Sequence, residues 1–378
     1  MIPLSVPNLS GNEWKYIKEC LDTNWVSSVG SYVNLFEKTV AEFCGVRSAV
    51  AISNGTSALH ISLLLSGVQR GDLVILPNIT FVAPANVIKY TGADPVLIDV
   101  DEQGWQMDLE ILQNFLEKNT IIKDQNCIHK ETGRRIAALL PVHVLGNICD
   151  LDRMLEVARK YCLVIVEDAT EALGSYYKSK HAGGFGKFGC LSFNGNKIIT
   201  TGGGGMILCN DEELGKKAKH LTTQAKADPN EYYHDEVGYN YRLVNILAAM
   251  GVAQMEQLPG FLKRKKEIKN NYDEFFKNIP GTAPQKITAN VQSNNWLYTA
   301  RLPQQQALRK HLLTNKIDVR PFWVPMNRLP AFKKDIYVQY EDVSEKVYSN
   351  CLSLPCSTNL TEEDQNTVLE LLKEFYHV

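Results

Sequence analysis

The sequence predicts an α/β protein with a mainly parallel β-sheet in a large domain, followed by a smaller α+β domain. Short apolar runs without alternation recur between residues 49 and 166, and amphipathic stretches separate several of them. Strands that are apolar on both faces belong in a sheet that helices cover on both sides. The chain has 378 residues, which exceeds the needs of one simple core. We expect the large domain over residues 1–250 and the small domain over residues 251–378.

The expected elements of the first half follow from local patterns. A capping-box pattern at residues 10–13 begins a first helix, and a turn-rich stretch at residues 24–30 follows it. Further helices are expected after residues 54–57 and over residues 150–161, where apolar positions share one face. The expected strands of the large sheet lie at residues 49–53, 73–76, 96–98, 136–140 and 163–166.

The second half begins with two more apolar runs. The first ends at Phe193, and the second begins at Met206. Beyond them the periodicity is helical from residue 211 to about 257, interrupted by a polar loop with Asp228-Pro229 and several tyrosines, and helical again over 263–276. The remainder has weaker periodicity, with a strand near residues 296–302 and a helix near 307–315. A last helix is expected from Thr361, with Val368, Leu372 and Phe375 on its buried face.

Composition excludes several classes of protein. The formal net charge is −2, so there is no basic field that would attract nucleic acid or an anionic membrane. No apolar stretch approaches the roughly 18–20 residues that span a bilayer, and the first residues lack the pattern of a signal peptide. The nine cysteines form no Cys-x-x-Cys pair. We therefore expect reduced thiols in a cytoplasmic protein without a bound metal.

Polar residues follow several of the expected strands, at the edge where ligands bind in such sheets. The free N–H groups of a helix that starts at residues 54–57 suit a phosphate, although ordinary capping explains the same residues. Asp168 ends an apolar run and is either a turn residue or a carboxylate aimed at a ligand. Phe81 is either a core side chain or a ring platform, and His143 is either a core histidine or a ligand contact.

A single lysine, Lys197, lies in a polar turn between two strand-like runs, and four consecutive glycines follow at residues 202–205. A surface lysine is one interpretation. The other is a lysine that binds the aldehyde of a cofactor and whose charge is lowered by its surroundings.

These residues together match the needs of pyridoxal phosphate. The cofactor requires a lysine for its aldehyde, a carboxylate against its ring nitrogen, a phosphate cradle and an aromatic ring beside its own. Lys197, Asp168, residues 55–57 and Phe81 supply these four groups, and Ser192 adds a hydroxyl for the phosphate.

Five segments also carry a resemblance to a known family. They read Asn-Gly-Thr-Ser-Ala-Leu, Thr-Phe-Val-Ala, Glu-Asp-Ala-Thr-Glu-Ala-Leu-Gly, Ser-Phe-Asn-Gly-Asn-Lys-Ile-Ile-Thr-Thr-Gly-Gly-Gly-Gly and Gly-Tyr-Asn-Tyr-Arg. Their order and spacing resemble the DegT/StrS-type nucleotide-sugar aminotransferases from Pro3 to the last helix. The resemblance implies the type I fold of pyridoxal phosphate enzymes and a homodimer with its active sites at the subunit interface.

The resemblance assigns roles to particular positions. It implies that Lys197 binds the cofactor aldehyde and moves protons, and that Asp168 pairs with the ring nitrogen. Glu171, which is usually Gln in the family, would lie beside the ring. Asn240 and Arg242 would reach the phosphate from the partner subunit. The expected cofactor contacts are Gly55, Thr56, Ser57, Phe81, Asp168, Glu171, Ser192, Lys197, Asn240 and Arg242, and the expected substrate contacts are Trp25, Ser28, His143, Asn194 and Arg320.

The segment around Lys197 is most similar to the LegC-type and bacillosamine-type UDP-sugar aminotransferases. This implies that L-glutamate donates nitrogen to C4 of a UDP-linked 2-acetamido-4-keto-6-deoxy sugar, as a step toward a surface glycan such as lipopolysaccharide. The alternatives are a GDP-perosamine-type or C3 keto-sugar aminotransferase and a non-catalytic sugar-nucleotide sensor. Sugar dehydratases of the family carry His where Lys197 stands. A dinucleotide loop at residues 202–205 would precede a strand instead of the helix that such a loop requires.

Overall fold

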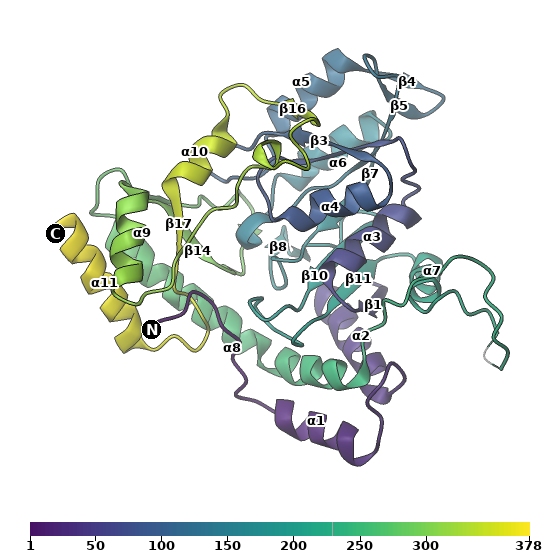
Figure 1. Cartoon of the computed structure of the whole chain (residues 1–378), viewed down its shortest axis with the longest axis horizontal. Helices are drawn as coiled ribbons and strands as arrows, with labels where there is room; N and C mark the ends of the chain where they lie inside the picture. Colours follow the sequence, from purple (N-terminus) through teal and green to yellow (C-terminus); the bar gives the residue numbers. More distant parts are fainter. Residues whose placement is uncertain (229) are drawn as a thin grey trace.

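The computed structural model describes residues 1–228 and 230–378. A large twisted sheet lies between two layers of helices, and a smaller sheet lies beside it (Figure 1). The strand order in the large sheet is β1-β11-β10-β7-β6-β2-β3-β16, and every neighbouring pair from β10 to β16 is parallel. This is the mainly parallel sheet that the apolar runs predict. Its strands are β1 (Ser48–Ile52), β2 (Leu73–Pro77), β3 (Asp94–Ile98), β6 (Arg135–Leu139), β7 (Val164–Asp168), β10 (Phe188–Ser192), β11 (Gly205–Cys209) and β16 (Ile336–Val338).

Two parts of the large sheet depart from the parallel pattern. Strand β11 pairs antiparallel with both β1 and β10, so that Met206 lies between Ala51 and Leu191. A hairpin of β4 (Thr120–Lys123) and β5 (Asn126–His129) adds antiparallel to β6. Asp124 and Gln125 form its turn with positive φ. The pairing of β11 with β1 joins segments that are distant in sequence, so local patterns do not predict it.

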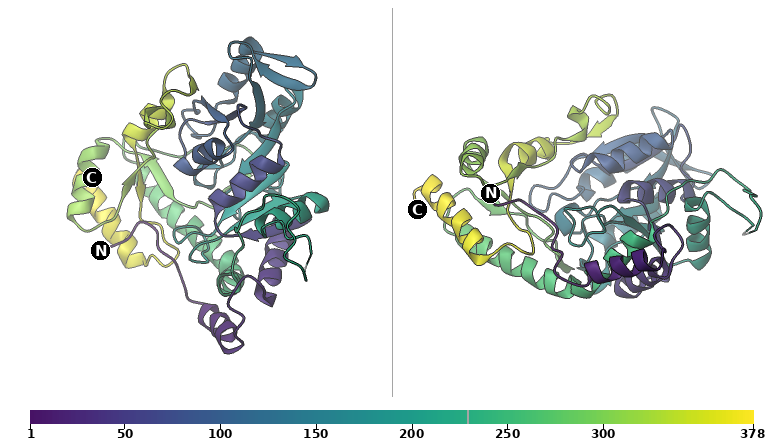
Figure 2. Two further views of the ribbon diagram at one scale, coloured as in Figure 1. Left: turned by 45° about the vertical axis from the view of Figure 1, so that its right-hand side comes forward. Right: turned by 60° about the horizontal axis from the view of Figure 1, so that its bottom comes forward.

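Helices cover both faces of the sheet (Figure 2). One core contains apolar residues of α2 (Ser31–Cys44), α5 (Leu109–Asn119), α6 (Leu151–Lys160) and the long α8 (Asn245–Phe276). The other core contains residues of α3 (Gly55–Leu65), α4 (Val82–Tyr90) and α7 (Glu212–Thr222). No helix within the described residues is long and apolar enough to cross a membrane.

The first helix, α1 (Glu13–Asp22), begins without the capping box that the sequence suggests. The Ser10 hydroxyl donates to Gln257 Oε1 of α8 instead of capping the helix. Glu13 is buried, and Gln254 and Gln257 donate to its Oε1. Glu13 Oε2 also accepts from the Gly11 N–H at 2.8 Å. The pattern at residues 10–13 therefore serves mainly to attach α1 to α8.

The small sheet has the order β12-β14-β17-β15 and a core of its own. The long α8 connects the two parts, since Phe261 packs in a large-sheet core and Ile268 in the small one. Val368 and Leu372 of the last helix are fully buried there. The elements are β12 (Ala283–Pro284), β14 (Tyr298–Arg301), α9 (Gln305–Thr314), β15 (Arg320–Pro321), β17 (Cys351–Leu354) and α11 (Glu362–Tyr376).

The chain returns from the small sheet to the large one before it ends. β16 pairs with β3, and α10 (Val343–Asn350) follows it. A third sheet joins β13 (Val291–Gln292), β8 (Tyr176–Tyr177) and β9 (Lys180–His181), and short 3-10 turns occur at η1 (Val144–Gly146) and η2 (Met326–Arg328). The division into a large domain over residues 1–250 and a small domain over residues 251–378 stays a prediction. β16 belongs to the second range in sequence but pairs within the large sheet.

Two glycines give matched tests of this packing. A Cβ on Gly189 of β10 would lie 2.1 Å from the carbonyl oxygen of Gly183, whereas a Cβ on Gly260 in α8 would meet no atom within 4 Å. We expect Gly189→Ala to lower the free energy of unfolding by about 1–3 kcal/mol through overpacking. Gly260→Ala should raise it by about 0.5–1 kcal/mol, because alanine favours a helix interior. Urea unfolding of both variants checks this, and equal stabilities would contradict it.

Candidate active site

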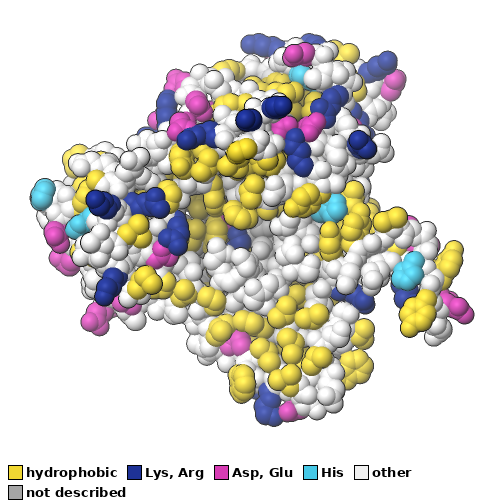
Figure 3. Space-filling view, viewed as in Figure 1, with side chains coloured by type: hydrophobic (Ala, Val, Ile, Leu, Met, Phe, Trp, Pro, Cys, Tyr) yellow, Lys and Arg dark blue, Asp and Glu magenta, His cyan; other side chains and the backbone are white. Residues whose placement is uncertain are grey.

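A cavity of about 440 Å³ lies at the carboxyl ends of β7 and β10, between the large and small sheets. The surface of the molecule is hollowed at this place (Figure 3). Strand ends, the first turns of α3 and α4, and residues 320–323 beside the small sheet all contribute to its walls. The cavity therefore lies where parallel sheets bind ligands.

Asp168 is the last residue of β7 and is almost fully buried at the cavity wall. Its Oδ1 accepts a hydrogen bond from the Thr170 backbone N–H at 3.0 Å. Among the described residues no cation lies within ion-pair distance of this carboxyl. Burial raises the pKa of Asp168, and the hydrogen bonds from Thr170 oppose the shift. A cationic or proton-donating ligand group would relieve this burial.

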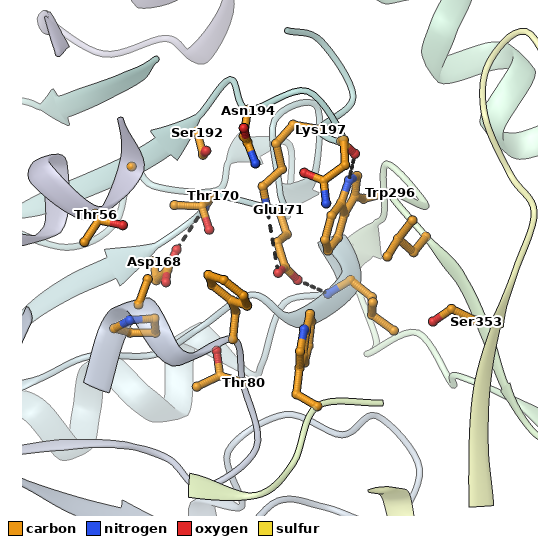
Figure 4. A pocket seen from close by; sticks show the side chains of 18 of the residues that line it. Thr56, Thr80, Asp168, Thr170, Glu171, Ser192, Asn194, Lys197, Trp296 and Ser353 are labelled. Atoms are coloured by element: carbon orange, nitrogen blue, oxygen red, sulfur yellow. Dashed lines mark hydrogen bonds and ion pairs between the residues drawn. The ribbon is translucent and has the colours of Figure 1, made fainter. Parts of the chain in front are cut away.

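Lys197 lies in the turn after β10, and its backbone N–H donates to the carbonyl of Asn194 at 3.0 Å. Its Nζ is 3.7 Å from Glu171 Oε1 and 4.0 Å from the ring centroid of Trp296 (Figure 4). Burial lowers the pKa of Lys197, and the carboxylates of Glu171 and Asp168 oppose this shift. The lysine is thus held inside the cavity, which excludes the surface-lysine interpretation.

Glu171 follows the end of β7 and is buried with its carboxyl between Lys197 and η1. Its Oε2 accepts a hydrogen bond from the Leu145 backbone N–H at 2.8 Å. Burial raises the pKa of Glu171 to about 7, against the attraction of Lys197. Burial disfavours both charges, and each group of this pair favours the ionised form of the other against that effect.

The first turn of α3 forms one end of the cavity. The Asn54 side chain caps the helix by accepting from the Ser57 N–H at 2.8 Å. The N–H groups of Gly55 and Thr56 have no acceptor within the helix, which suits an anion. A Cβ on Gly55 would lie 2.9 Å from Ser192 Cβ, so only glycine leaves this cradle open.

The structure brings together most of the predicted site residues and leaves others outside. Phe81, Asn194 and Arg320 line the cavity with the groups already described. Arg320 also donates to Asp318, and Phe81 is half exposed just before α4. Ser57 does not line the cavity, and its N–H is used by the helix cap. The residues outside the cavity are Trp25, Ser28, Ser57, His143, Asn240 and Arg242.

His143 requires a correction of the expected substrate contact. Its side chain is fully buried, with Nε2 2.9 Å from Glu167 Oε2. Glu167 also accepts from the backbone N–H groups of Gly183 and Gly186. His143 therefore does not line the cavity, and the structure favours the core-histidine interpretation.

Several lining residues were not singled out from the sequence. Trp296 and Leu297 precede β14, Phe322 and Trp323 follow β15, and Leu4 comes from the N-terminal segment. An aromatic residue in a weakly periodic stretch gives no local sign of what it contacts, so only the tertiary structure places these residues here.

A group with metal-ligand potential also occurs within the described residues, on the surface. His220, Asp235 and Glu236 approach one another beside α7, outside the cavity. Lys217 already pairs with Glu236 and competes with a cation there.

Comparison with known proteins finds a family whose model matches nearly the whole chain. The model of the DegT/DnrJ/EryC1/StrS aminotransferase family matches residues 7–373. GDP-perosamine synthase of Escherichia coli O157:H7 is 37% identical, over 99% of this chain and 98% of its own. A Campylobacter jejuni serotype O:2 protein, UDP-4-amino-4,6-dideoxy-N-acetyl-beta-L-altrosamine transaminase, is 31% identical over 91% and 89%. The structure of Spr1654 from Streptococcus pneumoniae in its PMP-form has a TM-score of 0.88 and 25% identity, covering 100% and 99%.

Enzymes of this family use pyridoxal phosphate. The site fits this group in three respects: a buried carboxyl at Asp168 without an ion-pair partner among the described residues, a helix start open to a phosphate at Gly55, and a largely buried amine at Lys197. The fold is likewise the type I fold of the pyridoxal phosphate-dependent sugar aminotransferases.

The raised pKa of Glu171 predicts a pH dependence of stability. With a pKa of about 7 in the folded protein and an ordinary value of 4.5, the folded state retains a proton that the unfolded chain releases. This contribution, on the order of 3 kcal/mol, is fully present below the ordinary value and is lost as pH rises through the folded value.

Glu171→Gln removes this titration. Between about pH 5 and about pH 8 the native apoprotein should lose this contribution, and the variant should not. We therefore expect the unfolding free energy of the variant, relative to that of the native apoprotein, to be higher at about pH 8 than at about pH 5. Urea unfolding at both pH values measures it, and a difference that does not vary with pH would contradict the assignment.

Proposed function

Because the chain belongs to the DegT/DnrJ/EryC1/StrS aminotransferase family and is a pyridoxal phosphate-dependent sugar aminotransferase, we propose that it transfers the amino group of L-glutamate to C4 of a nucleotide-linked 4-keto-6-deoxy sugar. The observation that carries this proposal is the largely buried Lys197, which faces Glu171 in the same cavity as Asp168. An aminotransferase needs these groups together, and a protein that only binds sugars does not.

We assign the cofactor contacts to residues at two ends of the cavity. Pyridoxal phosphate, when bound, acts as an electron sink that stabilises a carbanion next to the transferred nitrogen. The Asp168 carboxylate holds a proton on the ring nitrogen, which this role requires. The N–H groups of Gly55 and Thr56 and the Ser192 hydroxyl bind the phosphate.

Lys197 binds the aldehyde and is the proton carrier. Its Nζ must be neutral to accept a proton, and burial in the cavity increases the neutral fraction by lowering its pKa. Glu171, at 3.7 Å, stabilises the ammonium form once the proton has arrived. The pair therefore permits both directions of transfer without exposure of the lysine to bulk water.

The identity of the nucleotide is the finer part of the proposal. The segment around Lys197 resembles UDP-sugar aminotransferases, and the Campylobacter relative is named for a UDP-linked 4-amino-4,6-dideoxy sugar. The Escherichia coli relative, which is more similar, is named for a GDP-linked sugar. We propose the UDP-linked 2-acetamido sugar as substrate and a GDP-linked sugar as the second candidate.

We also propose that the active form is a homodimer with shared sites. Asn240 and Arg242 lie outside the cavity of their own chain, although they belong to a segment that resembles the partner contact of the family. The loop that precedes them carries exposed apolar side chains, as do α1 and the stretch at residues 24–30 (Figure 3). Exposed apolar surface of this kind favours contact with a second copy.

Spectroscopy tests both halves of the proposed reaction. The holoenzyme should show a visible absorbance band that moves to shorter wavelength with L-glutamate. A UDP-linked 2-acetamido-4-keto-6-deoxy sugar should then restore the band, and a GDP-linked 4-keto-6-deoxy sugar should do so more slowly. Faster recovery of the band with the GDP-linked sugar would make that sugar the favoured substrate and the UDP-linked sugar the second candidate. A protein that stays colourless with added pyridoxal phosphate would contradict the function itself.

Mixing two inactive variants tests the shared site. We expect both Lys197→Ala and Arg242→Ala to lose activity, since one lacks the proton carrier and the other the phosphate contact from the partner. After joint unfolding and refolding, half of the dimers are mixed, and each mixed dimer has one intact site. Activity should recover to about a quarter of the native level. A mixture as inactive as its parents would show that both residues serve the same chain's site.

A further inference from the structure

A second buried lysine lies behind the wall of the cavity. Lys265 belongs to α8, and its side chain is almost fully buried. Its Nζ donates to the Trp296 carbonyl at 2.7 Å and to the Cys356 carbonyl at 2.5 Å. Within the described residues no carboxylate lies close enough to form an ion pair with it. A buried ammonium without a counter-charge is expensive, and neutral backbone carbonyls stabilise it only in part.

The first carbonyl belongs to the residue whose ring faces Lys197. The Trp296 ring centroid is 4.0 Å from Lys197 Nζ, and its Nε1–H donates to the Asn196 carbonyl at 2.7 Å. Trp296 is therefore held at its backbone by Lys265 and at its ring by the residue before Lys197. A shift of this backbone would move the ring against the reacting amine.

The second carbonyl belongs to a segment that holds the N-terminal part of the wall. The Cys356 N–H donates to the Leu4 carbonyl at 2.9 Å, and Leu4 lines the cavity. The hydroxyl of the next residue, Ser5, donates to the same Asn196 carbonyl at 3.2 Å. The two carbonyls that Lys265 binds thus lead by separate routes to Asn196, directly before Lys197.

We infer that Lys265 is a positioning residue for the transfer reaction: its Nζ, as a hydrogen-bond donor, fixes Trp296, and through Trp296 it fixes the place of Lys197 Nζ in the cavity. This inference rests on the proposed role of Lys197 as the amine that binds the cofactor. Lys265 itself touches neither cofactor nor substrate.

The substitution Lys265→Met keeps an unbranched side chain, which is one atom shorter, and removes the Nζ donor. The adjacent Lys266 is exposed on the same helix, so Lys266→Met is the matched control. We expect apoenzyme with Lys265→Met to attach pyridoxal phosphate about tenfold more slowly than the control, because small displacements of a reacting group lower rates strongly. Stopped-flow absorbance measures this attachment.

Pyridoxamine phosphate distinguishes positioning from general damage. It carries an amine where pyridoxal phosphate carries the aldehyde, so it binds without a link to Lys197. We expect its Kd to differ by less than about twofold between Lys265→Met and Lys266→Met. Equal loss in attachment rate and in pyridoxamine phosphate affinity would show a merely structural role and overturn the inference.

A double-mutant cycle tests the route through Trp296. Trp296→Phe keeps an aromatic ring and removes the Nε1–H donor to Asn196. If Lys265 acts through Trp296, the double variant should attach the cofactor within about twofold of the slower single variant. Effects that multiply would overturn the inference. If Lys265→Met does not fold, Trp296→Phe alone decides, because a normal attachment rate in that variant would contradict the route.

Failure of this inference differs from failure of the proposed function. A folded Lys265→Met enzyme with a normal attachment rate would refute the positioning role and leave the function intact. A Lys197→Ala apoenzyme that still attaches pyridoxal phosphate with a visible band would refute the proposed role of Lys197.

Discussion

The structure depends on the burial of three ionisable groups at one edge of a parallel sheet. β7 and β10 are adjacent and parallel, so both strands end at the same edge of the sheet. Asp168 and the turn with Lys197 therefore lie at that edge. Glu171 lies 3.7 Å from the lysine and balances its charge. Asp168 has no cation within ion-pair distance among the described residues, and a cationic ligand group would offset the cost of its burial. Cofactor binding is therefore built into the charge balance of the fold.

The same geometry distinguishes the aminotransferase hypothesis from the dehydratase, dinucleotide-binding and sensor alternatives. A dehydratase of the family carries histidine where Lys197 stands. The run of glycines at residues 202–205 leads into β11 and not into a helix, so it lacks the helix start of a dinucleotide site. A sensor that only binds sugar nucleotides has no need of a buried amine facing a buried carboxyl. Lys265 gives α8 a second role. The helix packs against the sheet, and through Lys265 and the backbone carbonyls that it binds, the helix also supports the reacting amine.

Sequence patterns predicted the parallel strands, because each is a local apolar run that must be buried on both faces. They also predicted the polar residues at strand ends, since ligand sites follow from the direction of the strands. They did not predict that β11 pairs antiparallel with β1 or that β16 joins β3, because these partners are distant in sequence. They also missed the hairpin of β4 and β5, whose strands are adjacent in the chain but whose β4 residues are mostly exposed. His143 and Trp296 show the same limit, because each depends on what tertiary structure packs beside it: Glu167 encloses the first, and Lys197 faces the second.

The most direct test of the account is to find which amine carries the cofactor. Borohydride reduction of the holoenzyme fixes pyridoxal phosphate to the nitrogen that it is bound to, and peptide mass spectrometry then locates the label. We predict a single label on Lys197, which lies in the cavity with Glu171 and Asp168. A label on Lys265, on a surface lysine or on no lysine would contradict the central claim that the charge balance of this cavity makes Lys197 the reacting amine.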